Sequence, residues 1–215
     1  MGSQLFRVMA LTIVSVGAVF SNEILNPGFE AGNFTDWTLS GETVCMGVVA
    51  AGSSFFTEGG TICGGLGSSI VHAGNYAAYL GPQNSDGSLS QSVATVPGAT
   101  YDINFWLASL LLGLTNVPND FSVTWGGQTL VSKTNVSVSP FTDFDYHATA
   151  TGTSTTLTFT LRNDFSYFVL DDVSVTPVTS SVPEPRTMTT VAMIVIAGIL
   201  GASWRKTRRA SIMRT

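Results

Sequence analysis

Short runs of β-forming residues alternate with turn residues from Ile24 to Pro177, and this pattern constrains the fold more than any other feature. Gly, Pro, Asn and Asp at such short intervals predict strands joined by turns. The turns are expected at Asp86-Gly87, Pro97-Gly98, Pro118-Asn119-Asp120, Gly126-Gly127 and Gly152. The strands are expected at Trp37 to Leu39, Thr43 to Val49, Tyr76 to Leu80, Leu89 to Val96, Thr100 to Leu110, Phe121 to Trp125, Thr129 to Lys133, Phe141 to Thr149, Thr155 to Arg162 and Tyr167 to Val175. About ten strands at this spacing predict an all-β, antiparallel β-sandwich over residues 22–177.

One of these runs shows strict alternation. Leu157, Phe159 and Leu161 would share one face of a strand, and the intervening polar residues would share the other. The 24 Ser and 27 Thr of the chain agree with a β fold, because Thr is favoured in strands over helix interiors. Two segments are less regular: residues 107–114 are expected to be strand followed by loop, and the glycine-rich residues 52–67 to be a long surface loop.

The charges are distributed unevenly along the 215 residues, a length that favours one domain. Between Asn22 and Val182 the chain has thirteen acidic side chains but only two basic ones, Lys133 and Arg162, which gives this body a formal charge of −11. Nucleic-acid binding by the body is excluded, because neutralising phosphates requires a basic surface.

The first 21 residues have the pattern of a secretory signal peptide. Arg7 precedes thirteen uncharged residues, Val8 to Phe20, and small residues near Ser21 offer a cleavage position before Asn22. As a helix this run would extend only about 20 Å, too short to span a bilayer comfortably. The chain is therefore expected to be exported.

The C-terminal region has the pattern of a membrane anchor. After a linker at residues 178–186, eighteen uncharged residues from Thr187 to Trp204 would extend about 27 Å as a transmembrane helix. A basic tail, residues 205–215, follows. By the positive-inside rule this tail stays in the cytoplasm, which places the acidic body outside. The residues that set the orientation are Arg205, Lys206, Arg208 and Arg209.

Pro183-Glu184-Pro185, the hydrophobic helix and the Arg-rich terminus occur in an order that resembles the PEP-CTERM sorting signal of exopolysaccharide-producing Gram-negative bacteria. The resemblance implies recognition by exosortase, a membrane-embedded protease or transpeptidase of the host, and removal of the tail near the PEP motif. Exosortase and the membrane are thus the expected partners. The alternative is a permanent anchor with a proline-containing linker.

A second resemblance concerns the two ends of the body. Asn26-Pro27-Gly28-Phe29-Glu30, with Asp36-Trp37 soon after, and the closing run Val169 to Val175 resemble jelly-roll carbohydrate-binding modules and galactose-binding-like domains. Those modules pair their first and last strands. In many of them a structural calcium is held by a Glu just after the first strand and an Asp of the last, which here match Glu30 and Asp171.

The residues themselves leave the calcium site open. Simple alternation would put Asp171 on one strand face with Val169, Val173 and Val175, so that a buried carboxylate would need a partner. A hard cation bound by oxygen ligands is one solution. A hydrogen-bonded carboxylate that caps the sandwich is the other.

Cys45 and Cys63 are the only cysteines, and in an exported chain such a pair predicts one disulfide. Closing this loop is expected to contribute roughly 3 kcal/mol. No CxxC motif or histidine cluster indicates a zinc site.

The sequence contains no familiar catalytic motif. Asp143, Asp145 and His147 would share one face of a strand, as a metal or acid/base group or as an ordinary solvated face. Trp125, before a Gly-Gly turn, is the candidate for stacking on a sugar ring, whereas Trp37 and Trp106 are expected in the core.

Together these features predict a non-enzymatic, exosortase-sorted protein of the cell envelope or extracellular matrix that binds exopolysaccharide. A structural or adhesive surface protein without sugar specificity is the alternative, and a secreted hydrolase is the weakest one. No cofactor is required, and a structural calcium is the one candidate ion.

Overall fold

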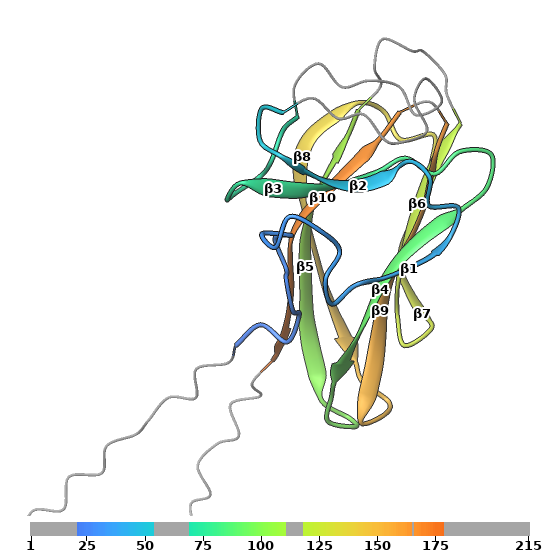
Figure 1. Cartoon of the computed structure of the whole chain (residues 1–215). Helices are drawn as coiled ribbons and strands as arrows, with labels where there is room; N and C mark the ends of the chain where they lie inside the picture. Colours follow the sequence, from blue (N-terminus) through green and yellow to red (C-terminus); the bar gives the residue numbers. More distant parts are fainter. Residues whose placement is uncertain (1–20, 54–68, 111–117, 165, 179–215) are drawn as a thin grey trace, which may run out of the picture. The chain divides into compact units, whose positions relative to one another are not determined.

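The computed structural model describes residues 21–53, 69–110, 118–164 and 166–178, and these form a sandwich of two antiparallel sheets (Figure 1). The strands are β1 (Thr38–Gly41), β2 (Met46–Ala50), β3 (Tyr76–Leu80), β4 (Gly87–Ala94), β5 (Thr100–Ser109), β6 (Asn119–Trp125), β7 (Gln128–Thr134), β8 (Ser139–Thr149), β9 (Ser154–Asn163) and β10 (Phe168–Pro177). The first sheet has the order β1-β4-β9-β6-β7, and the second has the order β2-β3-β10-β5-β8.

The predicted fold class is confirmed, and each predicted strand overlaps an observed one. Within the described ranges there is no helix, and hence none that could cross a membrane. The expected signal peptide, transmembrane helix and basic tail lie outside these ranges, as do most of residues 52–67 and of the loop expected after β5.

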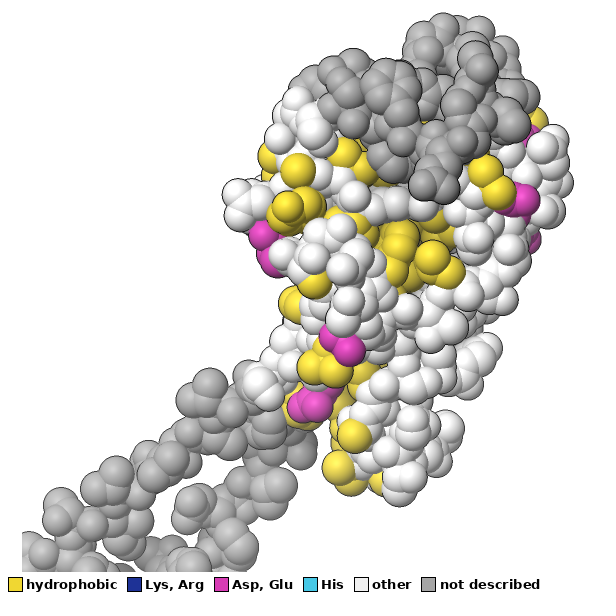
Figure 2. All heavy atoms as spheres, viewed as in Figure 1, with side chains coloured by type: hydrophobic (Ala, Val, Ile, Leu, Met, Phe, Trp, Pro, Cys, Tyr) yellow, Lys and Arg dark blue, Asp and Glu magenta, His cyan; other side chains and the backbone are white. Residues whose placement is uncertain are grey.

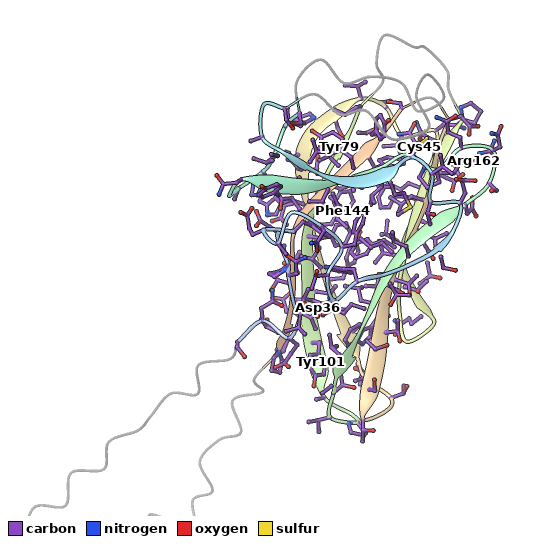
Figure 3. All side chains as sticks on the ribbon, in the orientation of Figure 1. Asp36, Cys45, Tyr79, Tyr101, Phe144 and Arg162 are labelled. Atoms are coloured by element: carbon purple, nitrogen blue, oxygen red, sulfur yellow. The ribbon has the colours of Figure 1, made fainter. Side chains whose placement is uncertain are left out.

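Aromatic side chains fill the space between the sheets. Phe105 of β5 stacks on Phe144 of β8 with 5.0 Å between ring centroids, and it meets Phe159 of β9 edge to face at 5.1 Å. Figure 3 shows Phe144 within the body of the sandwich. The alternation predicted for β9 is confirmed, because Leu157, Phe159 and Leu161 are all buried. These contacts join the two sheets through one hydrophobic core.

A smaller cluster covers part of the outer face of the second sheet. It consists of Cys45, Val49, Ala77, Tyr79, Ala108, Tyr167 and Val169. The Tyr79 hydroxyl donates to the Ile70 carbonyl oxygen at 2.9 Å, which holds the segment after residue 68 against this cluster. Figure 3 places Tyr79 and Cys45 near one end of the sandwich and Tyr101 near the other. Toward β8, this outer face is exposed at Asp143, Asp145 and His147.

The two ends of the domain lie close together, as predicted, although β1 itself does not pair with β10. β1 pairs with β4 at an edge of the first sheet, whereas β10 lies between β3 and β5 in the second. The segment before β1 instead lies alongside β10. The Glu23 amide donates to the Val175 carbonyl at 2.8 Å, and the Val173 amide donates to the Pro27 carbonyl at 3.0 Å.

A β-bulge interrupts β10 between Asp171 and Ser174. Asp172 occupies the left-handed region with φ of 47°, which an Asp tolerates better than most residues. The bulge reverses the alternation, so that Val173 and Val175 join the main core while Val169 joins the outer cluster. The expectation that Asp171 shares a face with three valines was therefore wrong for two of them.

Replacing Phe105 by Ala should lower the free energy of unfolding by about 3–5 kcal/mol, because it leaves a cavity between the two sheets. Val96→Ala, at a side chain that is 64% exposed, should change it by less than about 0.5 kcal/mol. Urea unfolding of the full-length protein measures both. Equal effects for the two variants would contradict this description of the core.

Candidate functional site

The open part of the second sheet's outer face is polar and is centred on one tryptophan. On β5, Asp102, Asn104 and Trp106 alternate with the buried Ile103 and Phe105, so they point away from the core. The sequence analysis wrongly placed Trp106 in the core. The signal that could have found it is this same alternation, because Trp106 shares a face with an Asp and an Asn.

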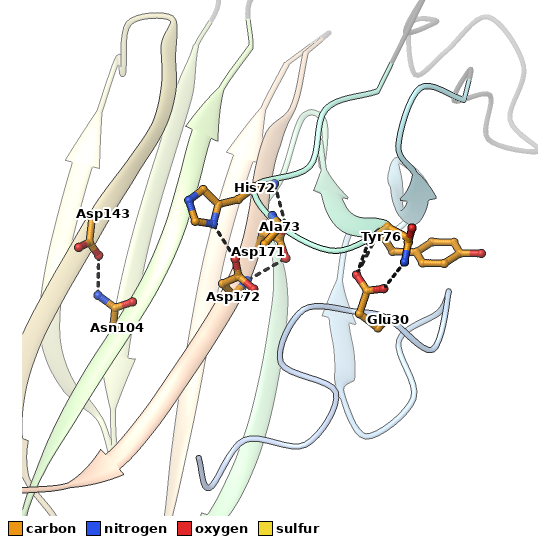
Figure 4. A network of polar contacts seen from close by, with 9 residues as sticks. Glu30, His72, Ala73, Tyr76, Asn104, Asp143, Asp171 and Asp172 are labelled. Carbon is orange, nitrogen blue, oxygen red and sulfur yellow. Dashed lines mark hydrogen bonds and ion pairs between the residues drawn. The ribbon is translucent and has the colours of Figure 1, made fainter. Parts of the chain in front are cut away.

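The neighbouring edge strand adds charged groups to this face. Register places Asp143, Asp145 and His147 of β8 opposite Trp106, Asn104 and Asp102 of β5, respectively. These three β8 side chains share one face of the strand, as predicted, and all three are exposed. The Asn104 side-chain amide donates to the Asp143 carboxylate (Figure 4).

His72 stacks on Trp106 from the loop before β3. The two ring centroids are 3.9 Å apart and the ring planes differ by only 13°. Nδ1 of His72 lies 2.5 Å from an oxygen of Asp172, and the edge of Phe141 meets the imidazole at 5.5 Å. Figure 4 shows His72 directed toward β10 and Asp172. The face thus presents a fixed pair of aromatic rings bordered by carboxylates and an amide.

Asp102, Asp145 and His147 form the tightest group on this face. One potential ligand atom from each lies within 4.8 Å of the others. Partial burial raises the pKa of Asp102, and a hydrogen bond with Asp145 raises it further. Oxygen Oδ1 of Asp102 is buried and has no hydrogen-bond partner in the part of the chain that the structure describes. Such a group can bind a divalent cation or accept hydrogen bonds from hydroxyl groups.

Glu30 and Asp171, expected to bind calcium, instead hold the loop of residues 72–76. Glu30 accepts hydrogen bonds from the backbone amides of Asn75 at 2.8 Å and Tyr76 at 3.0 Å, and these bonds lower its pKa although partial desolvation opposes them. Gly74 permits the close approach, because its φ of +67° suits glycine and a Cβ there would collide with the Glu30 carboxylate.

Asp171 is fully buried and is satisfied by amide donors. Its Oδ2 accepts from the backbone amides of His72 at 2.8 Å and Ala73 at 3.3 Å, and its Oδ1 accepts from that of Asp172 at 2.8 Å (Figure 4). Desolvation raises the pKa of Asp171 to about 6, against the opposing effect of these hydrogen bonds.

The donor set does not fit the expected calcium ion. Amide hydrogens already occupy most lone pairs of Glu30 and Asp171, which leaves few of their oxygen lone pairs for a calcium ion. The geometry favours the other alternative left by the sequence, a hydrogen-bonded cap.

Trp125, expected to be exposed for sugar stacking, is 1% exposed and packs on Tyr101 with 5.6 Å between centroids. That expectation was wrong, because the side chain points into the core just before the turn. Trp37 is buried as expected and stacks on Phe29 at 5.6 Å.

Cys45 is disulfide-bonded, and Cys63, the only other cysteine in the sequence, lies outside the described ranges. The remaining predicted site residues also lie outside them: Pro183, Glu184, Pro185, Arg205, Lys206, Arg208 and Arg209.

The fold is similar to that of a solved carbohydrate-binding module. A family 61 module in complex with β-1,4-galactotriose is 22% identical over 72% of this chain and 97% of its own, with a TM-score of 0.51. A family 22 xylan-binding domain from Paenibacillus barcinonensis is 15% identical over 72% of this chain and 94% of its own, with a TM-score of 0.47. No protein-family model and no curated protein matches the sequence. The first likeness supports the β-sandwich fold of such modules.

The buried carboxylate should make stability depend on pH. The pKa of Asp171 is about 6 in the folded protein and near 3.8 without burial, so its contribution to stability is present below about pH 4 and is lost as the pH rises through about 6. Urea unfolding across this range should show a decline for the wild type that Asp171→Asn reduces.

Glu30→Gln is the matched control, because the pKa of Glu30 is lowered and its contribution is instead lost as the pH falls below 4.5. Identical pH profiles for wild type and Asp171→Asn would contradict the buried cap. A melting temperature that rises with calcium and falls with EDTA would assign a metal to these carboxylates.

Proposed function

We propose that the outer face of the second sheet binds a carbohydrate, and that the chain is a non-enzymatic, exported protein of the cell envelope or extracellular matrix. The observation that carries the proposal is the stacked pair of Trp106 and His72 on an open sheet face, with carboxylates and an amide beside it.

These groups match the two kinds of surface on a sugar. The apolar face of a pyranose ring packs against an aromatic ring, while its hydroxyls need hydrogen-bond acceptors and donors at the edge. Asp143 and Asp145 supply acceptors, and Asn104 supplies both kinds of group. Register fixes all three beside Trp106, so little ordering is needed on binding.

Figure 2 shows scattered acidic side chains in a mostly uncharged surface on the side that it presents. The fold is shared with a module that was solved with β-1,4-galactotriose, which makes β-linked galactans the first glycans to test.

Hydrolysis is less well supported. The carboxylates of Asp102 and Asp145 approach within 4.8 Å and share a hydrogen bond. Inverting glycosidases separate their two carboxyl groups by about 6.5–9.5 Å to admit a water, and retaining ones by about 5–5.5 Å. This separation is too short for the inverting geometry, and no familiar catalytic motif accompanies the pair.

The proposal includes delivery by the C-terminal sequence. The support is the order of Pro183-Glu184-Pro185, an uncharged run long enough to span a bilayer and a basic terminus. In this proposal exosortase releases the body from a temporary anchor, and the sugar-binding face then acts on exopolysaccharide outside the cell.

Trp106→Ala should weaken binding of the best ligand on a glycan array by about tenfold or more, because it removes the stacking surface. Titration calorimetry of the full-length protein measures the loss. Thr158→Ala, on the outer face of the opposite sheet, is the control and should bind like the wild type.

Unchanged affinity in Trp106→Ala would reject this face as the binding site. Binding that EDTA abolishes would show that a cation at Asp102, Asp145 and His147 holds the sugar, whereas EDTA-insensitive binding supports direct hydrogen bonds.

Glu184→Ala should block recognition by exosortase without changing the hydrophobic helix, so the full-length precursor should accumulate in the inner membrane of the native host. A control variant, Thr187→Ala, should be processed normally. Mass spectrometry of wild-type protein checks the premise, and recovery of an intact C-terminus through Thr215 would establish a permanent anchor instead.

A further inference from the structure

A cavity of about 260 Å³ lies where the edges of the two sheets face each other, away from the Trp106 face. Phe144 of β8 and Phe121 of β6 provide aromatic walls, and their rings meet edge to face at 5.5 Å. Ser109, Ser139 and Thr142 add hydroxyl groups. The lining therefore combines aromatic surface with polar groups, as ligand pockets commonly do.

Lys133, a basic side chain without an ion pair among the described residues, also lines the cavity. Lys133 and Arg162 are the only basic residues of the acidic body. Arg162 pairs with Asp164 at 2.6 Å, but Lys133 forms no ion pair within the part of the chain that the structure describes. The Lys133 ammonium instead lies 5.9 Å from the centroid of the Phe144 ring.

Register explains how Lys133 reaches the cavity. It lies opposite Phe121 in the β6–β7 pair, and Phe121 is buried in the core. Directly opposed residues project from the same face of a sheet, so Lys133 starts on the core-facing side of an edge strand, although its side chain is exposed at that edge. Its ammonium group is held at the boundary between the aromatic wall and solvent.

The Ser109 hydroxyl is a second, independent reason to expect a ligand in this cavity. Its side chain is 1% exposed, and its hydroxyl has no hydrogen-bond partner among the described residues. A buried polar group is normally satisfied, because leaving it unpaired costs about 1–3 kcal/mol. Ser139 lies directly opposite Ser109, so two hydroxyl-bearing residues line the same part of the cavity.

We propose that this cavity binds a single sugar residue that carries a carboxylate, a uronic acid. Lys133 binds the carboxylate, Ser109 and Ser139 bind ring hydroxyls, and Phe144 contacts the apolar side of the ring. The volume is below the roughly 300 Å³ at which pockets for drug-sized ligands begin, which suits one ring. This second site does not depend on sugar binding at Trp106.

An inward lysine on an edge strand has another known use, which is to prevent edge-to-edge association of sheets. In that case removing the charge would change the oligomeric state and leave ligand binding unaffected. The two explanations therefore differ in which measurement responds to substitution.

The test is titration of the full-length protein with galacturonate and glucuronate, and with galactose and glucose as neutral counterparts. The uronates should bind at least about tenfold more tightly, because each adds a charge-assisted hydrogen bond to the ammonium group. Lys133→Met should remove that preference, and Lys133→Arg should retain it. Ser109→Ala should weaken uronate binding without abolishing the preference.

Mapping of amide chemical shifts in the wild type keeps the test independent of variant folding, and uronate should shift Lys133, Ser109 and Ser139. Trp106→Ala should leave these effects in place, so failure of the first site does not imply failure of the second. Equal affinity for uronates and neutral sugars, shifts confined to other residues, or an altered oligomeric state of Lys133→Met with unchanged uronate affinity would overturn the proposal.

Discussion

A carboxylate buried as completely as Asp171 must be hydrogen-bonded, and this requirement fixes the loop before β3 against β10. Its oxygens fix the backbone at His72 and Ala73, and its position beside the bulge of β10 fixes Asp172. His72 is thereby placed to stack on Trp106. The same buried charge that raises the free energy of the fold also aligns the aromatic pair of the proposed binding face.

The sequence predicted the strands well because their pattern is local. Alternation and turn residues located all ten, including the buried face of β9. It did not predict which strands are neighbours, because the pairing of β1 with β4 rather than β10 depends on contacts between distant segments. The bulge was missed because one residue, Asp172, adopts a left-handed conformation that composition does not reveal.

The candidate site was only partly visible in the sequence for a related reason. Alternation on β8 placed Asp143, Asp145 and His147 on one face, but their neighbours on β5 became known only from register. Trp125 was expected to be exposed and is buried, whereas Trp106 was expected in the core and lies on the outer face. Each was assigned from its immediate sequence neighbours rather than from its direction relative to the core. Lys133 became informative only when its cross-strand partner was known.

The central place of β10 has a mechanical consequence. The chain leaves the domain just beyond Pro177, where the Val178 amide donates to the Thr100 carbonyl, and β10 is bonded along its length to β5 and in part to β3. A pull applied to the chain at that end would act along a strand held on both sides, so several hydrogen bonds would resist it together. While the proposed C-terminal anchor holds the chain, tension between it and a bound matrix would act on β10.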